Sequence, residues 1–136
     1  MSDLLYKDEV YKLVGLCMEI HRELGKGHDE VIYKDALVLE LQRAGIPFQR
    51  ERKYEVSYKG VVLPHAYFAD FVLWDKIIYE AKSVEILAEG HTKQVLNYLA
   101  ASKLQLGLLV NFGGDSLEWK RVVLSRGRQD LPDLHK

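Results

Sequence analysis

The stretch FADFVLWDKIIYEAKS, residues 68–83, places three charged side chains inside two hydrophobic segments that have the composition of β-strands. A three-residue turn over residues 74–76 sets Asp70 directly opposite Glu80, in a register where the numbers of paired residues sum to 150. Side chains alternate along a strand, so Glu80 and Lys82 share one face of the sheet. This register predicts that Asp70 joins them and that the three charges converge.

Two carboxylates that oppose each other in a sheet repel unless a cation lies between them, and burial beside Phe68 and Val72 raises that cost. A divalent metal ion removes the conflict. Such oxygen ligands suit Mg²⁺ or Mn²⁺, which keep part of their water shell and leave room for a phosphate. Lys82 could then orient an attacking water or neutralise charge on the phosphate. The alternative is a solvated sheet face, on which Lys82 forms an ordinary salt bridge.

Hydrophobic periodicity and turn residues predict elements in the order α-α-β-β-β-α-β-β. The first three strands are expected to form an antiparallel meander, and the helix after them is a crossover that makes the third and fourth strands parallel. The predicted class is an α/β fold with a mixed β-sheet flanked by helices. The predicted helices are residues 7–24, 29–44 and 90–102, and the predicted strands are residues 48–58, 61–73, 77–84, 106–112 and 116–124.

The length of 136 residues fits one domain with a single hydrophobic core. We expect this domain to span residues 1–124 and a polar, frayed tail to follow over residues 125–136. Cys17 is the only cysteine, which excludes an intramolecular disulfide and fits a reducing compartment. The acidic amino terminus argues against a signal peptide, and no apolar run reaches the length of a membrane span. We therefore expect a cytoplasmic protein with no membrane partner.

The formal net charge of −1 provides no long-range field that would attract nucleic acid. Any such binding must come from local basic clusters, which are more often solvated surface. The candidates lie at residues 50–53, at Lys120 and Arg121, and at Arg126 and Arg128. Pairing of two subunits could join such patches into one continuous track, so a homodimer is a further expectation.

An acid on one strand, followed across a hairpin by Glu-x-Lys, resembles the PD-(D/E)XK nuclease superfamily, with Asp70 and residues 80–82 at the matching positions. Ala69 stands where the pattern has proline, a departure that the superfamily tolerates. GHDEVIY, residues 27–33, is similar to the Gly-x-x-Glu-x-x-Tyr motif of the small GxxExxY family in that superfamily. The resemblance covers about residues 7–124 and implies a restriction-endonuclease-like core. It extends through the segments EIHRELGKG, ALVLELQRAG, YKG, HTKQVLNYL and LGLLVNFG.

The resemblance also implies a further acidic metal ligand from a helix that precedes the first strand. Glu30, the glutamate of the motif, is the leading candidate, and Glu40 on the inward face of the same helix is its rival. Glu30 could instead be a first-turn acid favoured by the helix dipole, and Glu40 a helix-surface charge. Tyr33, the motif tyrosine, is a supporting residue.

Gln94 and Tyr98 lie one helical turn apart and share a face. They are similar to the Gln-x-x-x-Tyr element of helicase-linked, RecB-type nucleases, in which this helix lies beside the metal site. The resemblance implies that they hold the catalytic lysine or a DNA phosphate, although Tyr98 could simply belong to the core. His91, near the start of the same helix, is a further supporting candidate. The histidines share no zinc-ligand spacing.

The leading hypothesis is metal-dependent hydrolysis of phosphodiester bonds in nucleic acid, and DNA is the expected substrate. Mg²⁺, with Mn²⁺ as the alternative ion, would be held by Glu30, Asp70, Glu80 and the carbonyl of Ala81, while Lys82 assists the attacking water. A second hypothesis is a catalytically silent nuclease-fold protein that binds nucleic acid or serves as an accessory subunit. The near-neutral charge favours this alternative, because a freestanding nuclease usually needs a basic groove.

Overall fold

The computed structural model describes residues 4–125, which form three helices and seven strands. Most of the predicted tail, including Arg126 and Arg128, lies outside the described residues. The helices are α1 (Lys7–Leu24), α2 (Glu30–Ala44) and α3 (Glu89–Ser102). The strands are β1 (Phe48–Tyr54), β2 (Ser57–Tyr58), β3 (Val61–Val62), β4 (Tyr67–Leu73), β5 (Ile77–Lys82), β6 (Leu106–Asn111) and β7 (Glu118–Val123).

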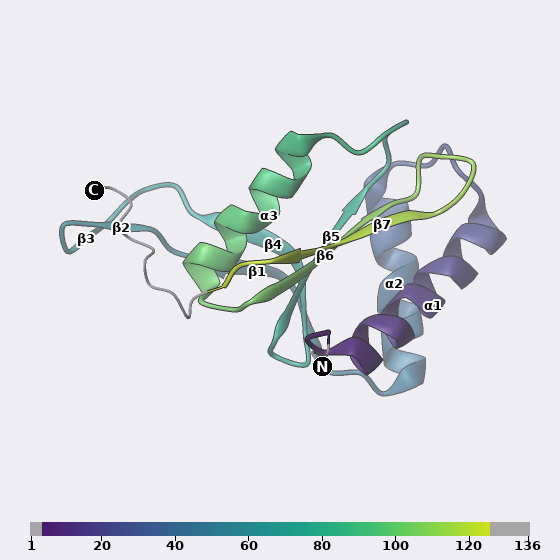
Figure 1. Cartoon of the computed structure of the whole chain (residues 1–136), viewed down its shortest axis with the longest axis horizontal. Helices are drawn as coiled ribbons and strands as arrows, with labels where there is room; N and C mark the ends of the chain where they lie inside the picture. The colour runs from purple at the N-terminus through teal and green to yellow at the C-terminus, as the bar shows by residue number, and fades with distance from the viewer. Residues whose placement is uncertain (1–3, 126–136) are drawn as a thin grey trace.

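A five-stranded mixed sheet in the order β1-β4-β5-β6-β7 lies between two layers of helices (Figure 1). The strands β1, β4 and β5 are antiparallel, and β7 is antiparallel to β6. Only β5 and β6 are parallel within this sheet, because α3 crosses over between them. The predicted α/β class and the predicted crossover are therefore confirmed.

Each face of the sheet has its own hydrophobic core. Phe71, Leu73 and Tyr79 pack under α1 and α2, whereas Val72 and Ile78 pack under α3. All residues of β6 are buried, as expected for a central strand that is apolar on both faces. The sheet therefore holds the middle of the β4–β5 hairpin rigidly between two packed layers.

The β4–β5 hairpin has the predicted register. Leu73 lies opposite Ile77, and Phe71 lies opposite Tyr79. The turn between them contains Trp74 with a φ of 53° and Asp75 with a φ of 56°. Because the flanking apolar side chains are buried on both faces, a shift by one residue would move each of them to the wrong core.

The long strands predicted over residues 48–58 and 61–73 are each interrupted, so that prediction was wrong in its extent. Their outer ends form a separate ribbon, β2–β3, around a turn at Lys59 and Gly60. Beyond β3, the Leu63 N–H still donates to the Val56 carbonyl at 2.8 Å. Pro64 follows, and it has no N–H with which to continue a ladder. The main sheet therefore begins again only at β4.

Candidate functional site

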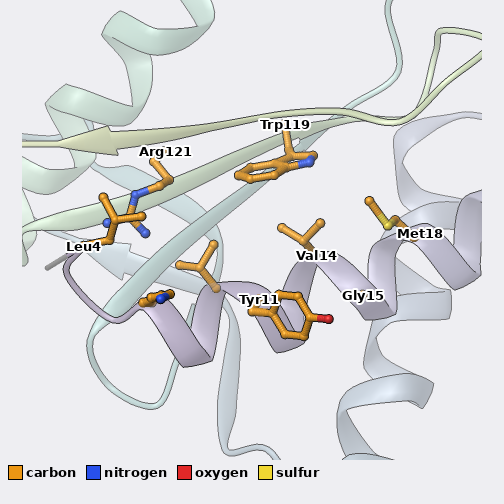
Figure 2. Close-up of a pocket in the computed structure, with 9 residues that line it drawn as sticks. Leu4, Tyr11, Val14, Gly15, Met18, Trp119 and Arg121 are labelled. Carbon is orange, nitrogen blue, oxygen red and sulfur yellow. The ribbon is translucent and has the colours of Figure 1, made fainter.

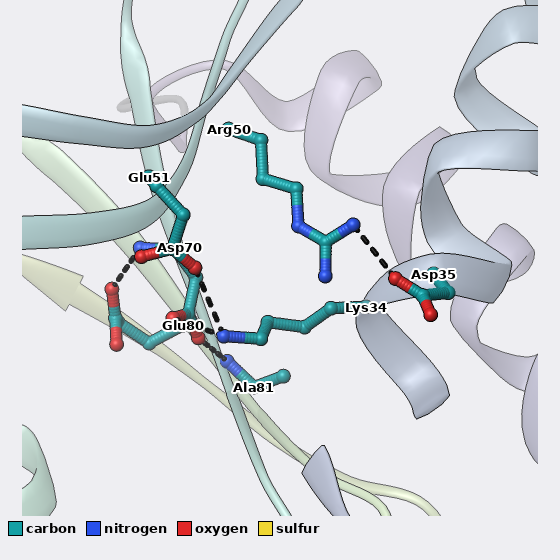
Figure 3. A network of polar contacts seen from close by, with 7 residues as sticks. All are labelled: Lys34, Asp35, Arg50, Glu51, Asp70, Glu80 and Ala81. Carbon is teal, nitrogen blue, oxygen red and sulfur yellow. Dashed lines mark hydrogen bonds and ion pairs between the residues drawn. The ribbon is translucent and has the colours of Figure 1, made fainter. Parts of the chain in front are cut away.

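The sheet opens between β4 and β5 beyond Phe71. Pairing of these strands ends there, while β5 continues along β6 as far as Lys82. In place of ladder bonds, the Asp70 N–H donates to Glu80 Oε2 at 2.7 Å, and the Ala81 N–H donates to Asp70 Oδ2 at 2.9 Å (Figure 3). Both acids are buried. The structure thus brings Asp70 and Glu80 together at the point where the two strands separate.

Strand alternation does not account for the position of Asp70. Phe71 packs in the core under α1 and α2, but Ala69 packs in the core under α3, so the alternation of faces is interrupted at Asp70. Glu51, the residue opposite it on β1, is not paired with it and has a φ of 56°. The convergence of the acids therefore depends on this change of face and on the gap between β4 and β5, rather than on the simple alternation assumed from the sequence.

Lys34 of α2 reaches this gap, and the sequence analysis did not identify it. Its Nζ lies 3.1 Å from Asp70 Oδ1 and 3.1 Å from Glu51 Oε2 (Figure 3). The Lys34 and Asp70 side chains are only 14% and 12% exposed. Burial acts to lower the pKa of Lys34, but the Asp70 and Glu51 carboxylates outweigh it, so the pKa lies above its usual value. An ammonium group therefore accompanies the acidic pair.

Only one sequence signal could have indicated Lys34. It lies one helical turn after Glu30, on a helix that is expected to pack against the sheet. Glu51 has no comparable signal, because it lies in a run of charged residues in which every side chain has the same prospect of being exposed.

Glu80 is the residue whose ionisation is most affected by the site. Burial raises the pKa of Glu80 to about 9, and the neighbouring Asp70 carboxylate adds to this effect. The Asp70 N–H and the ammonium groups of Lys82 and Lys34 act in the opposite direction but are weaker. Without a metal ion, Glu80 therefore keeps its proton at neutral pH.

This raised pKa predicts that stability without metal falls as the pH rises. Between the ordinary pKa of 4.5 and the folded-state pKa of about 9, the folded chain holds a proton that the unfolded chain has lost. The free energy of unfolding in EDTA should then fall by on the order of a few kcal/mol across this interval. Urea denaturation of wild type and Glu80→Gln at several pH values measures this, and Glu80→Gln should lose most of the slope. Equal slopes for wild type and Glu80→Gln would contradict the raised pKa of Glu80.

Three other predicted residues lie near the acidic pair. Lys82 is partly buried, its charge acts on Glu80, and its ammonium makes no hydrogen bond or ion pair within residues 4–125. Tyr98 is buried, and its pKa is raised by burial and then by the Glu80 and Asp70 carboxyls, which places it near them on the α3 side. Gln94, one turn earlier, is partly buried, and its side chain makes no hydrogen bond to the described part of the chain.

Two residues of the GHDEVIY motif have clear structural roles. Gly27 has a φ of 104°, which favours glycine. Tyr33 is fully buried, donates its hydroxyl hydrogen to the Gly25 carbonyl at 2.6 Å and stacks on Phe112 at a centroid distance of 4.4 Å. Glu30 is partly exposed, and among the described residues its side chain forms no hydrogen bond or ion pair. Glu30 is thus the motif residue that the fold itself does not explain.

Some predicted site residues are not brought to the acidic pair. No group of three acidic, histidine or cysteine side chains within residues 4–125 could hold a metal ion. Neither Glu30 nor Glu40 forms a hydrogen bond or ion pair with Asp70 or Glu80. His91 instead accepts a hydrogen bond at Nδ1 from the Ala88 N–H at 3.0 Å and closes the first turn of α3.

The donors that are present nevertheless fit a magnesium ion. Mg²⁺ is commonly bound through one or two carboxylates, and water or phosphate oxygens complete its shell. Asp70 and Glu80 supply two carboxyl groups. The N–H and C=O of one strand residue point to the same neighbour, so the Ala81 carbonyl faces the gap into which its N–H donates.

The mixed sheet between helical layers is a restriction-endonuclease-like fold. Its two acids and a lysine lie where two of the strands separate. The model of the PD-(D/E)XK nuclease superfamily matches residues 7–122. This chain therefore belongs to the PD-(D/E)XK nuclease superfamily, whose members are generally nucleases.

The crystal structure of SSO0001 has a similar fold, with a TM-score of 0.57 and 19% sequence identity. The similarity covers 90% of this chain but only 60% of SSO0001, and at this identity it concerns the fold alone. No curated protein matches the sequence. Within the described residues, none of the helices is both long and apolar enough to span a membrane.

Proposed function

We propose that this protein hydrolyses phosphodiester bonds of nucleic acid, with DNA as its substrate, in a reaction that depends on Mg²⁺ or Mn²⁺. The observation that carries the proposal is the convergence of two buried acids, Asp70 and Glu80, near Lys82, whose ammonium acts on Glu80 and has no hydrogen bond or ion pair among residues 4–125. In the metal-free protein Lys34 offsets the charge of Asp70 and Glu80 keeps its proton, so ionisation of both buried carboxyl groups together requires a further cation in the gap. Membership of a superfamily of nucleases supports the same reading.

Asp70, Glu80 and the carbonyl of Ala81 would hold the ion, and Glu30 at the start of α2 would complete the set. The bound ion supplies neutralisation of phosphate charge and eases deprotonation of water. Lys82 has no competing partner among residues 4–125, so its ammonium is available to orient the attacking water and to stabilise charge that develops on the phosphate.

On the α3 side of the sheet, the face to which Glu80 and Lys82 point, Gln94 and Tyr98 would contact the DNA phosphate or Lys82. Their position one turn apart on α3, with Tyr98 close enough to the acids to respond to their charge, supports this role.

We also propose that the chain belongs to the GxxExxY family, that residues 1–124 act as one domain, and that Tyr33 supports the site by holding the loop before α2.

Cleavage assays on single-stranded, duplex and branched DNA, with Mg²⁺, Mn²⁺ or EDTA, test the proposed reaction directly. We expect cleavage of at least one substrate with either ion and none in EDTA. Failure to cut any of them would contradict the enzymatic proposal. If calorimetry then still detected ion binding, the accessory role would be favoured, since the site would be formed but not catalytic.

We further propose that two copies pair along β7, the edge strand next to β6. No strand within residues 4–125 pairs with its outer side. Beside it, an apolar groove of about 410 Å³ lies between α1 and β7 (Figure 2). Tyr11 and Trp119 in this groove are 83% and 42% exposed. An open edge beside exposed apolar side chains is a typical interaction surface.

A second copy is favoured as the partner because β7 is complementary to itself. Antiparallel pairing that sets Trp119 against its own copy places Glu118 opposite Lys120 twice. The same pairing brings the two Lys120–Arg121 clusters together, as a continuous basic track requires.

Light scattering should therefore show a dimer of the wild-type protein. Trp119→Lys introduces like charges at the centre of the pair and should weaken association by about tenfold or more. Val62→Lys, which alters an exposed apolar residue on the separate β2–β3 ribbon, is the matched control and should remain dimeric. A monomeric wild-type protein at tens of micromolar would exclude this interface.

A further inference from the structure

Lys34 already occupies the acidic site as a cation. Its Nζ contacts Asp70 Oδ1 and Glu51 Oε2, each at 3.1 Å (Figure 3). The other oxygen of Asp70, Oδ2, accepts the Ala81 N–H. Both oxygens of Asp70 are therefore engaged in the metal-free protein, and an ion that approaches Asp70 meets an ammonium group first.

A divalent ion and this ammonium group cannot both remain close to Asp70 without strong repulsion, because the site is shielded from water. Lysine has a flexible four-carbon stem, so its charge can move while its backbone stays in place. Lys34 also contacts Glu51 at the same distance, and the Glu51 side chain is 51% exposed. Lys34 can therefore leave Asp70 and still keep a carboxylate partner toward solvent.

The conformation of Glu51 is consistent with such a role. A positive φ is uncommon for a residue other than glycine, and here it occurs within β1, opposite Asp70. The adjacent Arg50 does not compete for the Glu51 carboxylate, because its Nη1 pairs with Asp35 Oδ1 at 2.8 Å. The Glu51 carboxylate thus pairs with Lys34 and is not taken up by Arg50.

We propose that Lys34 is a displaceable counter-ion of the acidic site: its ammonium neutralises Asp70 in the metal-free protein, and when a divalent ion binds it leaves Asp70 and keeps its contact with Glu51. This inference rests on the proposed function, because it concerns metal loading at the same site. It gives the two lysines different tasks. Lys34 sets how readily an ion enters, whereas Lys82 has no ionic partner among the described residues and remains available to the substrate.

Calorimetric titration of the full chain with Mn²⁺ and with Mg²⁺ tests the displacement. Lys34→Met should bind either ion about tenfold more tightly, because no ammonium has to leave. Glu51→Gln should bind more weakly, since Lys34 loses its alternative partner, but should have no effect in the Lys34→Met background. Lys12→Met, on an exposed part of α1, is the control and should bind like wild type.

Two outcomes of this titration would overturn the inference. Unchanged or weaker binding by Lys34→Met would show that the ammonium does not compete with the ion. An equal loss for Glu51→Gln with and without Lys34 would make Glu51 a ligand of the ion instead of a partner for Lys34.

Denaturation in EDTA tests whether Lys34 neutralises Asp70 in the metal-free protein, and this measurement does not depend on activity. Lys34→Met should lower the denaturation midpoint of wild type, but it should have little effect in an Asp70→Asn background, where the buried charge of Asp70 is gone and only the exposed Glu51 carboxylate remains beside Lys34. An equal loss in both backgrounds would exclude Asp70 as the partner that matters.

The two proposals can fail separately. If wild type binds ions and cleaves DNA while Lys34→Met binds no more tightly, only the counter-ion role fails. If no variant binds a divalent ion, both fail, and a coupling seen in EDTA would identify the Lys34–Asp70 contact as an ordinary structural ion pair.

Discussion

Asp70→Asn is expected to abolish detectable divalent-ion binding and to slow DNA cleavage by about a thousandfold, equivalent to about 4 kcal/mol of transition-state stabilisation. Asp70 is the residue on which the site depends most, because its carboxylate contacts both the β5 backbone and Lys34. The amide has nearly the same shape but carries no negative charge. It therefore removes the attraction for the ion with little change in packing.

The control for this substitution is Asp115→Asn, the same chemical change in an acid that is exposed and paired with Lys26. It should bind ions and cleave DNA like wild type. Circular dichroism and the denaturation midpoint in EDTA show whether Asp70→Asn is folded, and Glu80→Gln provides a second test of the same site. Cleavage by Asp70→Asn at the wild-type rate would refute a metal site at the β4–β5 gap.

Lys82→Ala is expected to slow cleavage by about a hundredfold to a thousandfold while it leaves ion binding intact or slightly tighter. The ammonium of Lys82 has no hydrogen bond or ion pair within residues 4–125, so its removal leaves no buried partner unsatisfied. Its charge does act on Glu80, and the loss of that charge should favour a cation nearby. The expected result is a defect in the chemical step alone.

Single-turnover cleavage at saturating Mn²⁺, combined with calorimetry on the same preparation, separates these effects. Lys93→Ala, which removes an exposed lysine from α3, is the matched control and should behave like wild type. If Lys82→Ala cleaves as fast as wild type, Lys82 takes no part in the reaction. If it loses ion binding instead, its role is to maintain the site.

The central hairpin could be predicted because its determinants are local. Apolar residues on both sides of the turn at residues 74–76 leave one register in which they are all buried, and that register pairs Phe71 with Tyr79. Asp70 and Glu80 come next along the strands, where the ladder ends and the gap begins. The crossover by α3 follows in the same way from an apolar strand on each side of a helical segment. The division of the outer strands was also foreseeable, because Pro64 cannot continue a ladder.

The sequence could not predict how close each acid lies to the others within the site. The sequence predicted Glu30, ahead of its rival Glu40, as a further ligand beside Asp70 and Glu80, yet among residues 4–125 only Asp70 and Glu80 are brought into contact. A motif specifies residue types and spacing, but it does not specify how far a helix lies from the sheet. The place of Glu30 in the site therefore remains a prediction, which ion titration of Glu30→Gln can check.

The sequence by itself determined the helices and the register of the β4–β5 hairpin, because hydrophobic periodicity and turn geometry act over a few neighbouring residues. The contact between Asp70 and Glu80 also depended on the change of face at Asp70 and on the gap between the two strands. Only the tertiary structure decided that Lys34 and Glu51 belong to the same site. Their contacts join α2, β1 and β4, and depend on how the helix packs and on the change of face at Glu51 and Asp70. No local rule specifies such a meeting, since it results from the packing of three elements at once.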